Sequence, residues 1–209
     1  MTTTTASDGH HYGHGIVEPE SEGYLFPELK RILSAVQPDG GPIFEIGAGG
    51  GWTAAQLGEL GYQVTGVEIS ADGVALAQHN APAARIEHGS AYDDLAGIYG
   101  TFRTVYALEV VEHLYSPRLF AQRAYDLLPA GGHLVISTPF HGYWKNLMLA
   151  ATGKMDQHFT ALWDHGHIKF WSRRTLNALL TEAGFRNIQF SFAGRIYPLS
   201  KSFFACAER

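Results

Sequence analysis

Glycine recurs at alternate positions where a short apolar segment gives way to an amphipathic one. Gly47, Gly49 and Gly51 follow the apolar segment 42–46, and Ala48 separates the first two. Glycine adopts positive φ without steric cost and lets a ligand reach the backbone, while the N-terminus of a following helix offers free N–H groups. The arrangement predicts a ligand-binding loop, although a tight turn that needs glycine only for its geometry would give the same pattern.

An acidic residue, Glu68, ends the next apolar segment, 17 residues after Gly51. A carboxylate at this point can accept hydrogen bonds from both hydroxyls of a ribose, and the alternative is a solvated acid at the end of a strand. A dinucleotide would need a third glycine where Trp52 stands. Because the indole would obstruct close packing around a pyrophosphate, the loop favours an adenosine-containing ligand that lacks one.

Two carboxylates and an imidazole, Glu109, Glu112 and His113, follow the apolar segment 104–108. Such a group suits Mg²⁺, Mn²⁺ or Zn²⁺, although Mg²⁺ usually prefers an all-oxygen shell. The alternative is that Glu112 and His113 only form hydrogen bonds with the local backbone. The segment therefore predicts either a divalent cation site or a structural loop.

Further histidines follow the next expected strand, at His141, His165 and His167. An imidazole titrates near neutral pH and can act as a base toward a hydroxyl group within hydrogen-bonding reach. Histidines in loops are otherwise ordinary hydrogen-bonding side chains. We expect His141 and His167, together with His113, to be the candidates for direct participation in catalysis.

These residues must be positioned by alternating strands and helices. Two expected helices span 24–36 and 52–60, and three more begin after the caps Ser70, Ser116 and Ser172. The expected strands span 42–46, 64–68, 84–87, 104–108, 134–137, 188–192 and 203–207. The alternation predicts an α/β fold, a Rossmann-like doubly wound sheet of seven strands, mostly parallel with one antiparallel strand near the C-terminus. In such a sheet the ligand lies beyond the carboxyl ends of the strands.

Two segments do not fit the alternation. Residues 1–22 lack a periodic apolar pattern and are expected to form a flexible arm before one domain over 23–209. Residues 140–170 are too long for a plain connection and are expected to be an insertion that covers the acceptor. Within it, 142–155 is aromatic and apolar with lysines near both ends, which is typical of a peripheral membrane contact, a cover for a greasy ligand, or a buried core helix.

Composition restricts the class of protein. Hydrophobic residues make up 45% of the 209 residues and charged residues 17%, which is typical of a globular domain. The net charge of −5 and the pI near 6.1 argue against a nucleic-acid partner. The single cysteine, Cys206, cannot form an internal disulfide, and no apolar stretch is long enough to span a bilayer. We expect a cytoplasmic protein, either free or peripheral to a membrane, whose oligomeric state the sequence leaves open.

The glycine loop and the acid after it resemble the class I S-adenosylmethionine-dependent methyltransferases. Their first motif is an acid-x-G-x-G-x-G run after strand one, followed by an acid that ends strand two. The matching residues are Glu45, Gly47, Gly49, Gly51 and Glu68. The segments 107–114 and 128–132 are similar to the small-molecule methyltransferases of this class, and 137–139, Lys145-Asn146 and 165–170 are most similar to the ubiquinone-biosynthesis O-methyltransferases.

The resemblance implies a set of binding residues. It places the methionine moiety and the ribose of S-adenosylmethionine beside Glu45, Gly47, Ala48, Gly49, Gly51, Glu68 and Ile69, and the rest of the cofactor beside Ser90, Ala91 and Leu108. The family often has an Asp after strand three that holds the adenine amino group, whereas this chain has Ser90, with Asp93 or Asp94 as substitutes. In ubiquinone-type enzymes a run like Glu109-x-x-Glu112-His113 is associated with a divalent cation.

The function that the resemblance implies is methyl transfer from S-adenosylmethionine to a small-molecule acceptor, most often at an oxygen of an aromatic or lipid-like compound. An in-line displacement from a sulfonium needs alignment and exclusion of water more than special catalytic groups. Two alternatives remain at this stage. One is a non-catalytic S-adenosylmethionine-binding sensor or assembly protein, and the other is a nucleotide-dependent oxidoreductase, which Trp52 disfavours.

Overall fold

The computed structural model describes residues 21–159, 161–163 and 166–209. The arm expected over 1–22 lies outside these residues except for its last two, and His165 also lies outside them. Order in the described chain begins with a helix that starts at Glu22, slightly earlier than the sequence pattern indicates. Among the described residues no helix is both long and apolar enough to cross a membrane.

Seven strands form one sheet in the order β3-β2-β1-β4-β5-β7-β6. They are β1 (Gly41–Ile46), β2 (Tyr62–Glu68), β3 (Arg85–His88), β4 (Thr104–Leu108), β5 (His133–Pro139), β6 (Arg186–Ala193) and β7 (Ser202–Glu208). Strands β1 to β5 pair in parallel, and β7 runs antiparallel to both of its neighbours. The predicted fold class, with its one antiparallel strand, is confirmed.

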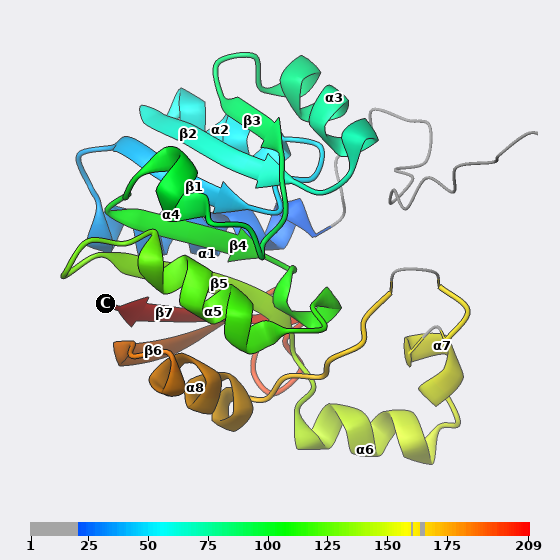
Figure 1. Cartoon of the computed structure of the whole chain (residues 1–209). Helices are drawn as coiled ribbons and strands as arrows, with labels where there is room; N and C mark the ends of the chain where they lie inside the picture. The colour runs from blue at the N-terminus through cyan, green and yellow to red at the C-terminus, as the bar shows by residue number, and fades with distance from the viewer. Residues whose placement is uncertain (1–20, 160, 164–165) are drawn as a thin grey trace, which may run out of the picture.

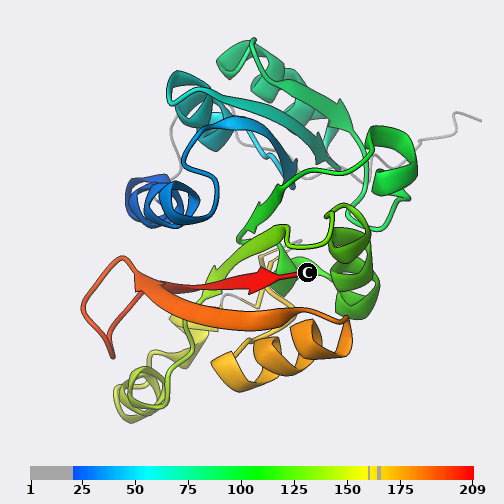
Figure 2. The same cartoon turned by 90° about the vertical axis from the view of Figure 1, so that its left-hand side faces the viewer.

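Helices cover both faces of the sheet (Figures 1 and 2). They are α1 (Glu22–Val36), α2 (Trp52–Glu59), α3 (Ala71–Asn80), α4 (Leu95–Tyr99), α5 (Pro117–Asp126), α6 (Tyr143–Ala151), α7 (Met155–Phe159) and α8 (Arg173–Glu182), with a 3₁₀ turn at Val111–His113. Apolar residues of α1, α2 and α3 form one core with the sheet, and those of α4, α5 and α8 form the other. Both faces of the sheet are therefore buried, as a parallel sheet requires.

Local capping chemistry explains where several helices begin. The Ser70 hydroxyl accepts from the Gly73 N–H, and Ser172 forms a capping box with Thr175, so two predicted caps are confirmed. Ser116 makes no capping bond, and α5 instead begins with a proline at its first position. The five-residue helix α4 was not predicted from the sequence, because so short a segment carries no helical periodicity.

The insertion lies at the edge of the sheet where β5 ends (Figure 1). Helices α6 and α7 have no buried residue among those described, whereas α1 buries Leu25, Leu29, Ile32 and Leu33. The interpretation of this segment as a buried helix that completes the core is therefore wrong. Its apolar side chains either line a cavity or face solvent.

The close contact between Gly51 and α3 yields a stability prediction. A Cβ on Gly51 would lie 2.7 Å from Ala77 Cα, and its φ of 78° is strained for any other residue. We expect Gly51→Ala to lower the free energy of unfolding by about 2–4 kcal/mol, measured by urea denaturation.

The control is Gly58→Ala in the same helix. Nothing lies within 4 Å of a Cβ at Gly58, so this change should raise the stability by up to about 1 kcal/mol, because alanine favours helix. Equal effects of the two substitutions would contradict the packing argument.

Candidate active site

The glycine loop leaves β1 and enters α2 at the carboxyl edge of the sheet. Gly47, Gly49 and Gly51 all have positive φ, at 80°, 52° and 78°. Space also requires glycine, because a Cβ on Gly47 would lie 2.6 Å from a methyl group of Val110. The Asn80 amide of α3 donates to the Gly50 carbonyl at 2.8 Å and fixes the loop from the other side. Positive φ, the contact with Val110 and the hydrogen bond from Asn80 together fix the conformation of the loop.

Glu68 ends β2 beside this loop and is 5% exposed. Its Oε2 accepts from the Gly49 N–H and its Oε1 from the Ser70 N–H, each at 2.9 Å. The alternative of a solvated acid at the end of a strand is therefore wrong. Each carboxylate oxygen has two lone pairs, so the group can hold the loop and still accept hydrogen bonds from a ligand.

Glu45, the acid that begins the motif, lies below the loop and is 3% exposed. Burial raises the pKa of Glu45 to about 8; the Tyr106 hydroxyl partly opposes this shift, and Glu22 and Glu68 add to it. Glu45 Oε2 makes no hydrogen bond in the described chain. Burial therefore favours the neutral carboxylic acid form of Glu45.

The other expected cofactor residues line the same edge. Ile69 is 56% exposed directly after Glu68, and Leu108 ends β4 half-buried. Ser90 Oγ accepts from the Tyr92 N–H, and Asp93 accepts from the Ser90 N–H at 2.7 Å. Ala91 lies in this turn and packs against the core. Asp94 instead caps α4, so Asp93 is the acid that contacts Ser90.

Glu109 follows β4 in a strained conformation, with φ of 53°. Its two carboxylate oxygens accept from the Ser137 hydroxyl at 2.7 Å and the Ser202 hydroxyl at 3.2 Å. Burial raises the pKa of Glu109 to about 7, while Ser137, Ser202 and Lys145 lower it. Left-handed backbone at a residue other than glycine is concentrated at functional sites. Both oxygens face the hydroxyls of β5 and β7 rather than the other predicted metal ligands.

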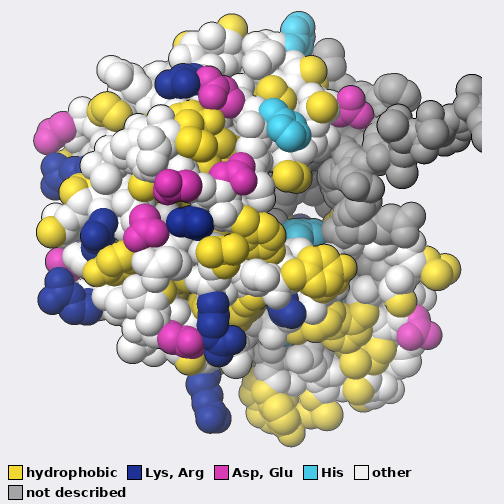
Figure 3. Space-filling view, viewed as in Figure 1, with side chains coloured by type: hydrophobic (Ala, Val, Ile, Leu, Met, Phe, Trp, Pro, Cys, Tyr) yellow, Lys and Arg dark blue, Asp and Glu magenta, His cyan; other side chains and the backbone are white. Residues whose placement is uncertain are grey.

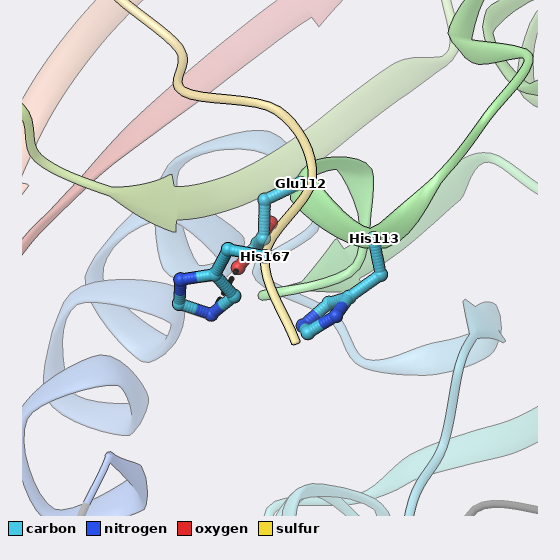
Figure 4. Close-up of side chains that lie close together, drawn as sticks. All are labelled: Glu112, His113 and His167. Carbon is cyan, nitrogen blue, oxygen red and sulfur yellow. Dashed lines mark ion pairs between the residues drawn. The ribbon is translucent and has the colours of Figure 1, made fainter. Parts of the chain in front are cut away.

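Glu112, His113 and His167 lie together, and each offers a ligand atom within 4.8 Å of the others (Figure 4). Glu112 is 1% exposed; its Oε2 accepts from Thr138, and its Oε1 lies 3.9 Å from His167 Nε2 without a hydrogen bond. Burial, with Glu109 adding to it, raises the pKa of Glu112 well above its ordinary value. The structure therefore brings two of the three predicted metal ligands together and replaces Glu109 by His167.

The main chain explains why His167 reaches this place. The Glu112 carbonyl accepts from the N–H groups of Ile168 and Lys169, both at 2.9 Å, which joins the end of the insertion to the 3₁₀ turn. His113 Nδ1 lies 3.2 Å from the Gly166 carbonyl, and because a carbonyl oxygen only accepts, Nδ1 donates this hydrogen bond. An imidazole oriented in this way can ligate a metal ion through its other ring nitrogen.

A cavity of about 490 Å³ opens beside this group, lined by His141, Asn146, Phe159, Ala161, His167 and Phe170. Its size suits one small aromatic molecule. Burial lowers the pKa of His141 and of His167 to about 4, so both imidazoles are neutral at pH 7. His141 Nδ1 and Asn146 Oδ1 have no hydrogen-bond partner in the described chain. The cavity is apolar with a few polar atoms that a ligand could engage.

Sequence reasoning missed several residues here. Asn146, His158, Phe159 and Phe170 reach the cavity or its walls only through the fold of the insertion. Asn146 and Phe170 lie in segments that resemble the O-methyltransferases, but no role at the site was predicted for any of the four. Ser137 and Ser202, which hold Glu109, come from strands that are far apart in sequence. The only other signal in the sequence was that residues 140–170, which include aromatic and polar side chains, do not fit the alternation of strands and helices.

Comparison with known proteins agrees with this geometry. The family model described as a methyltransferase domain matches residues 20–190. The chain belongs to this methyltransferase family. It is 32% identical over 151 residues to the ubiquinone biosynthesis O-methyltransferase of Azorhizobium caulinodans. This alignment covers 68% of this chain and 58% of that protein. The chain spans about half the length of the curated relatives it matches.

Solved structures show that this methyltransferase domain has the fold of other such enzymes. A SAM-dependent methyltransferase from Archaeoglobus fulgidus aligns with a TM-score of 0.70 and 16% identity, over 88% of this chain and 92% of that one. Magnesium protoporphyrin IX methyltransferase from Synechocystis with bound SAH aligns with a TM-score of 0.66 and 19% identity. That alignment covers 88% of this chain and 81% of the other. The seven-stranded sheet is therefore common to this chain and to enzymes of low sequence similarity.

The buried acid below the loop gives a pH prediction. A carboxyl group whose pKa is raised on folding stabilises the fold below its unfolded pKa of 4.5 and loses that contribution as the pH rises through about 8. Between about pH 5 and pH 9 we expect the unfolding free energy of the wild type to fall by on the order of 3 kcal/mol more than that of Glu45→Gln.

Urea denaturation at a series of pH values measures this difference. Glu109 and Glu112, whose pKa values are also raised by burial, are present in both proteins, so the comparison isolates Glu45. Parallel pH profiles for the two proteins would show that Glu45 does not titrate in this range.

Proposed function

We propose that this domain transfers a methyl group from S-adenosylmethionine to an oxygen of a small aromatic or lipid-like acceptor. The observation that carries the proposal is that the glycine loop after β1 and the cavity after β5 open at the same edge of the sheet. Parallel strands place both carboxyl ends there, so a cofactor on the loop and an acceptor in the cavity would meet above β4. The similarity to O-methyltransferases of ubiquinone biosynthesis supports an oxygen acceptor.

The cofactor would lie along the loop and the ends of β2 and β3. Gly47, Ala48, Gly49 and Gly51 would line the methionine moiety, since their backbone allows close approach. Glu68 would accept from the ribose hydroxyls, with Ile69 against the adenine face. Glu45 and Leu108 would lie under the cofactor. Ser90 and Ala91, with Asp93 behind them, would lie beside the adenine.

The acceptor would occupy the 490 Å³ cavity, where Phe159 and Phe170 can pack against an aromatic ring. A phenol attacks more readily once its proton moves to a base or its charge is stabilised. His167 and His141, both neutral at pH 7, line the cavity and could accept a hydrogen bond from the hydroxyl group. His113 lies behind His167, with 4.9 Å between the ring centroids.

The Glu112, His113 and His167 group has the chemistry of a divalent cation site. One carboxyl group and two imidazoles form a donor set that Zn²⁺ and Mn²⁺ accept, and the buried Glu112 Oε1 has no hydrogen-bond partner in the described chain. A cation there would supply charge that favours the phenolate form of an acceptor. Glu109, which the sequence places among the metal ligands, would not bind the cation, because its two carboxylate oxygens accept hydrogen bonds from Ser137 and Ser202.

The cofactor assignment is tested through Glu68. Glu68→Ala should weaken S-adenosylmethionine binding by about 1.5–3 kcal/mol, or roughly 10- to 150-fold, because it removes charge-assisted hydrogen bonds. Isothermal calorimetry measures the change, and Glu59→Ala, an exposed acid on α2, is the control. Unchanged affinity in Glu68→Ala, or tighter binding of NAD than of S-adenosylmethionine, would overturn the assignment.

The cation assignment is tested with a chelator and a catechol-like acceptor. Turnover should fall in chelator and return with Zn²⁺ or Mn²⁺, while S-adenosylmethionine binding stays unchanged. His113→Ala and His167→Ala should each reduce kcat by about tenfold or more, because each removes one group that stabilises the transition state. Cofactor affinity should change little. His79→Ala, an exposed histidine of α3, serves as control. Full turnover in chelator excludes a required metal and leaves the two imidazoles as bases, which a pH–rate profile would show.

A further inference from the structure

The imidazole of His141 lines the cavity, and packing rather than hydrogen bonding fixes its orientation. The ring stacks on Phe159, with 6.0 Å between centroids and 16° between planes, and lies perpendicular to the Phe170 ring at 5.0 Å. Its Nδ1 is shielded from solvent and has no hydrogen-bond partner in the described chain. Aromatic neighbours thus hold the ring in place and leave its hydrogen-bonding capacity unused.

Asn146 of α6 lies in the same wall and also has an unpartnered atom. Its amide nitrogen donates to the His141 carbonyl at 3.4 Å, and its Oδ1 is buried without a hydrogen-bond partner in the described chain. The His158 ring lies 5.6 Å from the His141 ring, and its Nε2 is likewise buried and unpartnered. An unpaired buried polar atom lowers stability, so three of them around one cavity indicate a ligand that would pair with them.

The rest of the wall is mainly apolar. Apart from His167, the other lining side chains are Phe159, Ala161 and Phe170. Figure 3 shows hydrophobic side chains over the lower right of the view, where α6 and α7 lie in Figure 1. A hydrogen bond in apolar surroundings is stronger than in water, and a polar group that finds no partner there is penalised. Such a wall discriminates between ligands that pair with these atoms and ligands that do not.

The chemistry of the unpartnered atoms selects the kind of group that fits. Neutral imidazole has one donor and one acceptor nitrogen, and the Asn146 Oδ1 only accepts. A hydroxyl group both donates and accepts, so it can pair with both side chains. A carboxylate would leave the Asn146 Oδ1 without a donor, and an ammonium would meet the positive charge of Lys145, which acts on His141. An aliphatic chain would pair with neither.

We propose that His141 and Asn146 recognise a second hydroxyl group of the acceptor, on a substituent of its aromatic ring, distinct from the oxygen that is methylated. This rests on the proposed function, because it takes the cavity to be the acceptor site. His167, which belongs to the group with Glu112 and His113, would meet the oxygen that is methylated. The terminal torsions of His and Asn are broad, so each side chain can turn its unpartnered atom toward the bound hydroxyl.

Calorimetry with a matched pair of catechols tests the recognition. Hydroxyethylcatechol and propylcatechol, substituted at the same ring position, have substituents of equal length and differ in one hydroxyl group. An apolar wall without recognition would favour the propyl compound, because its burial removes more apolar surface from water. With saturating S-adenosylhomocysteine, which has no methyl group to transfer, the wild type should instead bind hydroxyethylcatechol at least about tenfold more tightly. Any contact of the shared ring hydroxyls cancels in this ratio.

Variants of similar shape assign the preference to the two side chains. His141→Phe and Asn146→Leu remove the polar atoms, so each should abolish or invert the preference while propylcatechol binds as well as before or better. His141→Gln keeps a neutral donor and acceptor and should retain the preference, which a merely structural role of the ring would not explain. His79→Phe and Asn177→Leu, the same changes at exposed positions of α3 and α8, should behave like the wild type.

Two results would overturn the proposal alone. One is wild-type protein that binds the two catechols equally or prefers propylcatechol, and the other is a wild-type preference that persists in both His141→Phe and Asn146→Leu. Either result leaves methyl transfer in this cavity intact. Wild-type protein that binds S-adenosylmethionine but neither catechol would contradict the cavity as the acceptor site, and this proposal with it, while the cofactor assignment would stand.

Discussion

The Glu68 carboxylate holds two turns of the chain at once, and the geometry of the glycine loop depends on it. Through Gly49 and Ser70 it joins the loop after β1 to the turn after β2. Charge-assisted hydrogen bonds to backbone N–H groups are strong inside a protein, and here they fix backbone rather than flexible side chains. The loop can therefore be glycine-rich without being loose, which preorganises a surface for close contact with a ligand.

Three further carboxyl groups, Glu45, Glu109 and Glu112, lie at the ends of β1 and β4 with their pKa values raised by burial. Burying acids without basic partners lowers stability, and the left-handed Glu109 adds backbone strain. A fold selected only for stability would place apolar residues at these positions. Their concentration at one edge of the sheet, beside neutral histidines, is the arrangement expected when stability is exchanged for a reactive site.

The insertion connects this site to the exterior of the domain. Its final segment is joined to the 3₁₀ turn by the two backbone hydrogen bonds to the Glu112 carbonyl, which bring His167 to Glu112. Its first helix directs polar side chains inward and apolar ones outward. The same thirty residues thus bring His167 to Glu112, line the cavity beside it and present an apolar outer face. One consequence is that a change in the insertion can alter both the chemistry and the surface.

The sequence by itself determined the sheet, the glycine loop and the acids at the ends of β1, β2 and β4. Period-two and helical patterns, glycine conformation and capping residues act over a few neighbouring positions. Only the tertiary structure decided which of those groups meet. Glu109 turns to Ser137 and Ser202, and His167 takes its place beside Glu112, since contacts across strands and across the insertion have no signal in local spacing. The direction of the α6 face was likewise undetermined, because an amphipathic pattern shows that two faces differ but not which of them is covered.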